Sequence, residues 1–346
     1  MMGNRESPLQ PGLLMDKLAL SLRWWLLLLL LMVSCLWCLN TGAVALQWST
    51  LLPCLIEQCD TMVQQQILLE LRLPRLLLGL VAGAGLALSG ALLQNLSRNM
   101  LADPYLFGII SGAGLGATLA TLLLPQYAIA LPLAAFAGAV LAMALVLGFA
   151  LLGGWQRLDT MILAGVAVSF LLSAITSLLL YQSEAFAANR VMFWLMGSLA
   201  RADYQALWVI TPCLLLCFAL ACLFRRQLDA MQWSDQTAYG LGVAVVPIRL
   251  LFLLLTAALT ASIVAYCGGI GFVGLMIPHL VRLMLGGQTL VLLCGSVLCG
   301  SMFLIWVDAT ARTLLPDQEV PLGVITAGIG SLFFLMLLSR KSPRPR

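Results

Sequence analysis

The stretch that decides the fold is Tyr105–Gln156, YLFGIISGAGLGATLATLLLPQYAIALPLAAFAGAVLAMALVLGFALLGGWQ, which contains no Asp, Glu, Lys or Arg. It is too long for one membrane span, since a spanning helix takes roughly 20 apolar residues. A turn near Pro125–Gln126 would divide it into two spans. Helices are expected because every backbone polar group within lipid must pair inside its own segment.

The rest of the chain has the same character. Of its 346 residues, 62% are hydrophobic and 9% are charged, whereas an ordinary soluble domain is about 25% charged. This composition excludes a soluble enzyme, a disordered chain, a collagen-like rod and a disulfide-framed secreted module. The net charge of +4 comes from scattered residues, so no nucleic-acid partner is expected. The sequence predicts an all-α polytopic membrane protein.

Hydrophobic runs predict about ten spans in one transmembrane domain covering residues 1–346, with no room for a soluble domain. The tail 1–22 precedes the first span, and the longest inner loop covers about 225–247. The predicted spans lie near residues 24–46, 73–94, 105–124, 128–152, 160–181, 206–224, 248–267, 270–286, 289–307 and 321–338.

The basic residues predict that both termini are cytoplasmic, because Lys and Arg gather on the cytoplasmic side of membrane proteins. With that orientation the outer side receives only Arg72, Arg75, Arg190, Arg201 and Arg312. The inner side receives Arg5, Lys17, Arg23, Arg98, Arg157, Arg225, Arg226, Arg249, Arg282, Arg340, Lys341, Arg344 and Arg346.

Two features near the N-terminus leave alternatives open. Arg23, the following leucines and Ala43–Ala45 resemble a cleaved signal peptide, but cleavage would leave an odd number of spans, so a retained first helix is favoured. Cys54 and Cys59 fall in the first outer loop, where an oxidising compartment would permit a disulfide.

The chain lacks the residue patterns of catalysis and metal binding. His279 is the only histidine, and metal sites usually need three or four ligands, so a helix-start or packing role is expected. The sequence has no metalloprotease or serine-hydrolase pattern and no phosphate-binding loop with a lysine. We expect no enzyme activity, no metal and no cofactor, and any ATP must be bound by another chain.

Several segments together resemble the FecCD-type permeases of ABC importers. They are Leu71–Arg75 (LRLPR), Ala84–Gln94 (AGLALSGALLQ), Arg98–Pro104 (RNMLADP), Gly108–Ala113 (GIISGA), Gly269–His279 (GIGFVGLMIPH) and Glu319–Ala327 (EVPLGVITA). The resemblance runs from about residue 70 to 338. It implies the type II ABC importer permease fold, in the bacterial inner membrane.

The resemblance also implies partners and residue roles. A second permease subunit, identical or paralogous, would lie alongside, with two ATP-binding subunits below and a periplasmic substrate-binding protein above. Arg72, Arg75 and Arg312 would meet acidic residues of the binding protein, although they could also lie at the lipid surface. In the inner loop, Asp235, Ala238, Leu241 and Gly242 match the segment that docks into the ATPase, where Trp233–Ser234 departs from the family's usual Leu-Gly.

Small residues recur at intervals of four and allow helix backbones to approach closely. We expect helix packing or path lining from Gly79, Gly83, Gly90, Gly108, Gly112, Gly271, Gly274 and Pro278. By resemblance, the fifth and tenth spans would line the solute path.

These observations predict the permease of an ATP-driven importer that moves a ferric siderophore or related metal chelate by alternating access. Cobalamin and haem remain open as alternative cargoes. A proton-coupled secondary transporter would carry ionisable residues within its spans, and an intramembrane enzyme would carry a paired catalytic set; the predicted spans favour neither.

Overall fold

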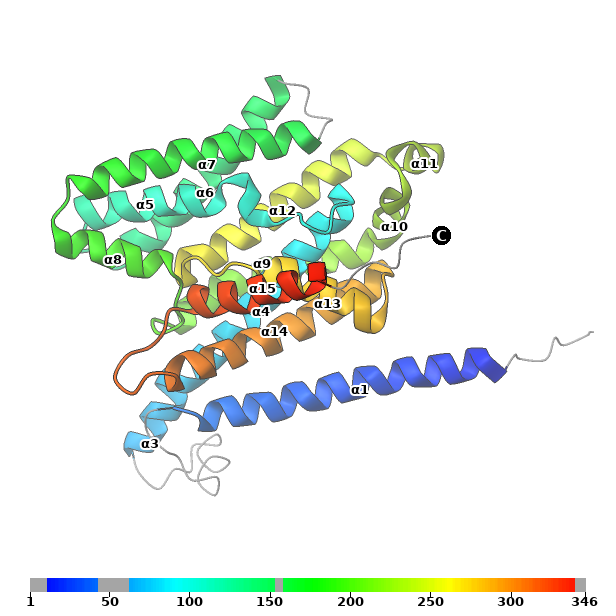
Figure 1. The fold of residues 1–346 in the computed structure, drawn as a ribbon, viewed down its shortest axis with the longest axis horizontal. Helices are drawn as coiled ribbons and strands as arrows, with labels where there is room; N and C mark the ends of the chain where they lie inside the picture. The colour runs from blue at the N-terminus through cyan, green and yellow to red at the C-terminus, as the bar shows by residue number, and fades with distance from the viewer. Residues whose placement is uncertain (1–10, 43–61, 153–157, 340–346) are drawn as a thin grey trace, which may run out of the picture.

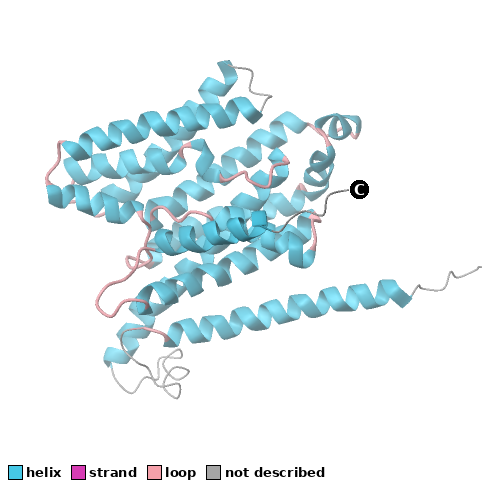
Figure 2. Cartoon of the chain, in the orientation of Figure 1, coloured by secondary structure: helices cyan, strands magenta, loops and turns pink. Residues whose placement is uncertain are grey.

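A computed structural model describes residues 11–42, 62–152 and 158–339, and every regular element within these ranges is a helix (Figure 1, Figure 2). The helices of the first half are α1 Pro11–Asn40, α3 Met62–Gln66, η1 Ile67–Arg72, α4 Leu73–Ser97, η2 Pro104–Phe107, α5 Ile109–Leu123, α6 Ala130–Leu152 and α7 Leu158–Tyr181. Those of the second half are α8 Ala185–Leu195, α9 Tyr204–Leu223, α10 Arg225–Trp233, α11 Asp235–Gly240, α12 Val245–Cys267, α13 Val273–Leu285, α14 Thr289–Thr313 and α15 Leu322–Ser339.

Each of the ten predicted spans overlaps one apolar helix of the structure, although residues 43–46 of the first span lie outside the described residues. In the described residues, eight helices are long and apolar enough to cross a membrane. The other two, α5 and α13, are apolar but shorter. The all-α polytopic fold is therefore confirmed. The described part of Tyr105–Gln156, which ends at residue 152, contains most of η2 followed by α5 and α6, with a turn near Pro125 as predicted.

Three details differ from the sequence prediction. Helix α1 begins at Pro11, so much of the predicted tail 1–22 is already helical. The segments 182–205 and 225–247, expected as loops, contain α8 and the pair α10 and α11. Helix α13 begins at Val273, so His279 lies within this helix and not at its start, and its ring packs against Phe333 and Phe334 of α15.

Helix α4 is the most buried span. Of its most apolar window, 83% is buried, against 17% for α15 and 22% for α7. It contacts α9, α12, α13 and α14 (Figure 1). A second group of helices, α5, α6 and α7, packs beside α12. The exposed apolar faces of α7 and α15, which are the fifth and tenth spans, leave them available to lipid or to another subunit.

Glycines bring α4 against its neighbours at backbone distance. A Cβ atom built on Gly83 would collide with the carbonyl group of Gly300 on α14, and one on Gly90 would collide with the backbone of Gly274 on α13. Gly112 on α5 meets Gly138 on α6 in the same way. These positions exclude any side chain, whereas Gly271 has open space around it, so close packing does not explain that glycine.

The two ends of the bundle carry the two predicted sets of arginines. Arg75 and Arg312 lie at the end where α3, α8 and the connection between α14 and α15 gather, and Arg98 and Arg249 lie at the end of α10 and α11 (Figure 1). This separation along the helix axes agrees with the division into outer and inner sides. The two ends are called the outer end and the inner end below.

The glycine contacts predict a position-specific loss of stability. Replacing Gly90 with Ala should lower the free energy of unfolding by about 1–3 kcal/mol or more, because the added methyl group overpacks a backbone contact. Gly148→Ala is the matched control, since Gly148 lies on α6 with nothing near its Cβ position. Thermal unfolding of both purified variants in detergent measures this, and equal midpoints would contradict it.

Candidate functional site

At the outer end, Arg75 connects two elements that are far apart in the sequence. Its side chain on α4 forms an ion pair with Asp308 of α14, with 2.8 Å between Nη2 and Oδ1. The same guanidinium donates to both carboxylate oxygens of Glu319, at 2.8 and 2.9 Å. Asp308 is only 4% exposed, whereas Glu319 is 45% exposed. One arginine therefore links a buried and an exposed carboxylate.

The other two predicted docking arginines hold the end of α1. Arg72 donates to the carbonyl oxygens of Leu39 and Asn40 at 2.9 and 3.1 Å. Arg312 donates to the carbonyl oxygen of Thr41 at 2.7 Å and also pairs with Asp308. Because the last carbonyl groups of a helix have no intrahelical donor, two cations at this terminus are stabilising.

The structure thus brings Arg72, Arg75 and Arg312 to the same end of the bundle and gives each of them partners within the chain. Their contact with a binding protein remains a prediction. Asp308, the partner of both Arg75 and Arg312, was not identified from the sequence. The sequence did offer one signal, an isolated acidic residue within an apolar segment. Such a residue is expected to be buried, and a buried charge requires a partner of opposite charge.

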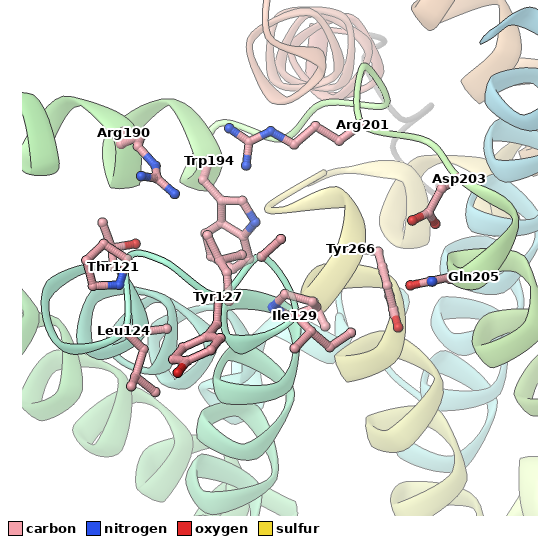
Figure 3. Close-up of a pocket in the computed structure, with 16 residues that line it drawn as sticks. Thr121, Leu124, Tyr127, Ile129, Arg190, Trp194, Arg201, Asp203, Gln205 and Tyr266 are labelled. Carbon is pink, nitrogen blue, oxygen red and sulfur yellow. The ribbon is translucent and has the colours of Figure 1, made fainter. Parts of the chain in front are cut away.

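An open cavity of about 760 Å³ lies at the outer end, between α5, α6, α8 and α12 (Figure 3). Its walls come from the turn between α5 and α6, from α8, from the α8–α9 connection and from the end of α12. A smaller cavity of about 390 Å³ reaches from the same walls to the α14–α15 connection. The two cavities share the lining residues Arg190, Trp194, Arg201 and Tyr266.

The inner end is formed by α10 and α11. Ser234 begins α11 as its N-cap, and its hydroxyl accepts a hydrogen bond from the Thr237 amide at 2.9 Å. Gly242 ends the turn at φ +77, a left-handed conformation that favours glycine. The serine that departs from the family's usual residue therefore has a local structural role.

The four predicted coupling residues differ in their exposure and in their contacts. Ala238 is buried, whereas Leu241 is mostly exposed, as are the rings of Trp233 and Tyr239 in the same segment. Asp235 accepts from Arg249 of α12 at 2.8 Å and pairs with Arg98, at the end of α4, at 3.1 Å. An exposed apolar surface is thus joined by one carboxylate to two central spans.

Two further predictions from the sequence concern metal binding and a disulfide. No group of three or more His, Cys, Asp or Glu residues there could hold a metal ion. Cys54 and Cys59 lie outside the described residues.

Comparison with known proteins gives one consistent family. The model of the FecCD transport family matches residues 29–340. The chain is 40% identical to a cobalamin import system permease protein of Halobacterium salinarum, over 81% of this chain and 75% of that relative. It is 38% identical to a hemin transport system permease protein of Yersinia pestis, over 91% of this chain and 94% of that relative.

A solved structure agrees with this family. It shows an inward-facing conformation of a metal-chelate type ABC transporter. The TM-score is 0.82 at 34% sequence identity, and the match covers 92% of this chain and 98% of the other.

The two ion pairs of Arg75 predict that Asp308 and Glu319 contribute unequally to stability. Asp308→Asn should lower the free energy of unfolding by roughly 3 kcal/mol or more, because it removes the charge that balances two mostly buried arginines. Glu319→Gln should cost less than about 1 kcal/mol at neutral pH, since this pair is exposed and screened by solvent. Denaturant unfolding in detergent measures both, and equal losses would contradict the assignment.

The Glu319 pair should also respond to acid. Hydrogen bonds from Arg75 hold the pKa of Glu319 below its ordinary value of 4.5. The ionised Glu319 carboxylate therefore contributes its full share to the free energy of unfolding above pH 4.5, and this share is lost as the pH falls through the lowered pKa. The difference in stability between wild type and Glu319→Gln should shrink in that range.

Proposed function

Because the chain belongs to the FecCD transport family, we propose that this permease of an ABC importer carries a metal chelate, most readily a ferric siderophore, across the bacterial inner membrane. The observation that supports this most strongly is the match to the metal-chelate type transporter along almost the whole of both chains. The relatives named for cobalamin and hemin keep those cargoes as alternatives.

The proposed assembly follows from what the chain lacks and what it exposes. The sequence has no phosphate-binding loop with a lysine, so ATP hydrolysis is assigned to two separate ATP-binding subunits. A second permease subunit, identical or paralogous, would cover exposed apolar faces such as that of α7. A periplasmic substrate-binding protein would deliver the cargo to the outer end, with both termini of the permease in the cytoplasm.

Coupling to ATP is proposed to pass through Asp235. An ATPase that holds the exposed surface of Trp233 and Leu241 would move α11 when it binds or hydrolyses ATP. Asp235 would carry that motion to α4 through Arg98 and to α12 through Arg249, since both ion pairs begin at the same carboxylate. Helix α4 has about 25 residues and is therefore roughly 38 Å long, which reaches from the inner end to Arg75 at the outer end.

The test of the function is uptake by the reconstituted importer. Proteoliposomes containing the permease and its ATPase, with the binding protein outside, should accumulate radioiron–siderophore only when ATP is present inside. Accumulation by the permease alone, driven by a proton gradient, would overturn the proposal in favour of a secondary transporter.

The same vesicles test the coupling proposal. Asp235→Asn should lower uptake at least several-fold while the assembled ATPase continues to hydrolyse ATP, because the carboxylate that joins α11 to two spans loses its charge. Asp229→Asn is the matched control, because this exposed acid of α10 makes no ion pair with the described residues. Equal effects of the two variants would show that the Asp235 pairs transmit nothing.

Docking of the binding protein is proposed to replace Glu319 with a carboxylate of the partner. Glu319 is the exposed member of the Arg75 cluster, so it is the acid that a partner can displace without uncovering Asp308. Glu319→Gln should therefore strengthen docking several-fold, measured by surface plasmon resonance on the nanodisc-embedded importer. Unchanged or weaker docking would remove Arg75 from the docking surface.

A further inference from the structure

We propose that Arg190 and Arg201 form an anion-binding site in the outer cavity and that the cargo is therefore a chelate with net negative charge. This inference rests on the proposed function and narrows its substrate class. It separates anionic complexes, such as ferric catecholates and carboxylates, from electrically neutral ones, such as ferric hydroxamates.

The two arginines differ from the other arginines at the outer end. Arg72, Arg75 and Arg312 all bind groups of this chain. Arg190 of α8 and Arg201 of the α8–α9 connection are exposed, and they make no ion pair or side-chain hydrogen bond with the described residues. Their charges are therefore available to a ligand.

The geometry directs both charges into one space. Arg190 and Arg201 line both cavities, although they come from different elements. Figure 3 shows their guanidinium groups extending toward one another beside Trp194. Two guanidinium groups on one side of a cavity can bind a carboxylate or catecholate through paired N–H···O hydrogen bonds.

The acids near this site are already engaged. Among the described residues, Asp203 is the one carboxylate that lines the larger cavity, and it accepts a hydrogen bond from the Ala206 amide at 2.8 Å as the N-cap of α9. Glu319 lines the smaller cavity, where its carboxylate is held by Arg75. Neither acid belongs to the wall that the two cavities share, where the charged residues among those described are Arg190 and Arg201, so this wall is positively charged.

The remaining walls suit an organic chelate. Trp194, Tyr127 and Tyr266 provide aromatic surfaces around the cavity (Figure 3). A volume of about 760 Å³ falls in the range of cavities that hold small organic ligands. An acidic patch on a protein would meet protruding arginines more easily than arginines within a concavity, which favours the cargo over the binding protein as the anion.

The test compares two iron complexes of similar size and different charge. The permease–ATPase complex in lipid nanodiscs is titrated with a radioiron tricatecholate, which is anionic, and with a radioiron trihydroxamate, which is neutral. Arg190→Gln/Arg201→Gln should weaken binding of the tricatecholate by about tenfold or more and remove its salt dependence. The trihydroxamate should bind equally to wild type and variant, and Arg190→Lys/Arg201→Lys should retain part of the preference.

A control variant separates the site from overall charge. Arg23→Gln removes a positive charge at the inner end, where Arg23 donates to the carbonyl oxygen of Met284, so tricatecholate binding should not change. The inference is overturned if the double Gln variant binds the tricatecholate normally, if it loses both complexes equally, or if wild type binds neither. It is also overturned if only docking of the binding protein is lost.

The outcome is distinguishable from failure of the proposed function. ATP-driven uptake of a neutral chelate but not of an anionic one would reject the anion site and leave the importer assignment intact. Absence of any ATP-driven uptake in the reconstituted vesicles would reject the function itself.

Discussion

Backbone contact between α4 and its neighbours is the constraint on which the rest of the structure depends. Gly83 against Gly300 and Gly90 against Gly274 leave no space for even a methyl group. Lipid supplies little hydrophobic driving force for helices to associate, so such close van der Waals packing is a main source of stability within a membrane. Close-packed interfaces also resist small gradual deformation, so α4 and its partners are expected to move as units.

Because α4 is held rigidly by this packing, it connects the charged groups at its two ends. Arg98 ends the helix beside Asp235 at the inner end, and Arg75 begins it beside Asp308 at the outer end. A displacement applied to one ion-pair cluster would therefore reach the other through a single helix that is packed on several sides. The proposed alternating access requires such a connection, because the nucleotide and the cargo would act at opposite ends of the permease.

The sequence predicted the features that depend on composition, but it did not predict contacts between residues that are far apart in the chain. Apolar length alone located ten apolar helices, eight of which are long enough to cross a membrane in the described part of the chain. It could not identify α8, α10 or α11, because short helices at the membrane surface need no long apolar run. Arg75 and Asp308 are 233 positions apart, and no local pattern connects them. The recurring glycines indicated close approach, but which glycine meets which is decided by the three-dimensional packing.

The same limit applies to the five outer arginines, which the charge count treats as one group. The structure divides them by their partners. Arg72, Arg75 and Arg312 satisfy helix carbonyls and buried carboxylates, so removing them would disturb the chain before it disturbed any ligand. Arg190 and Arg201 have no such task among the described residues and face a cavity. The anionic cargo is therefore proposed to bind Arg190 and Arg201, whereas docking of a partner carboxylate at Arg75 must first displace Glu319.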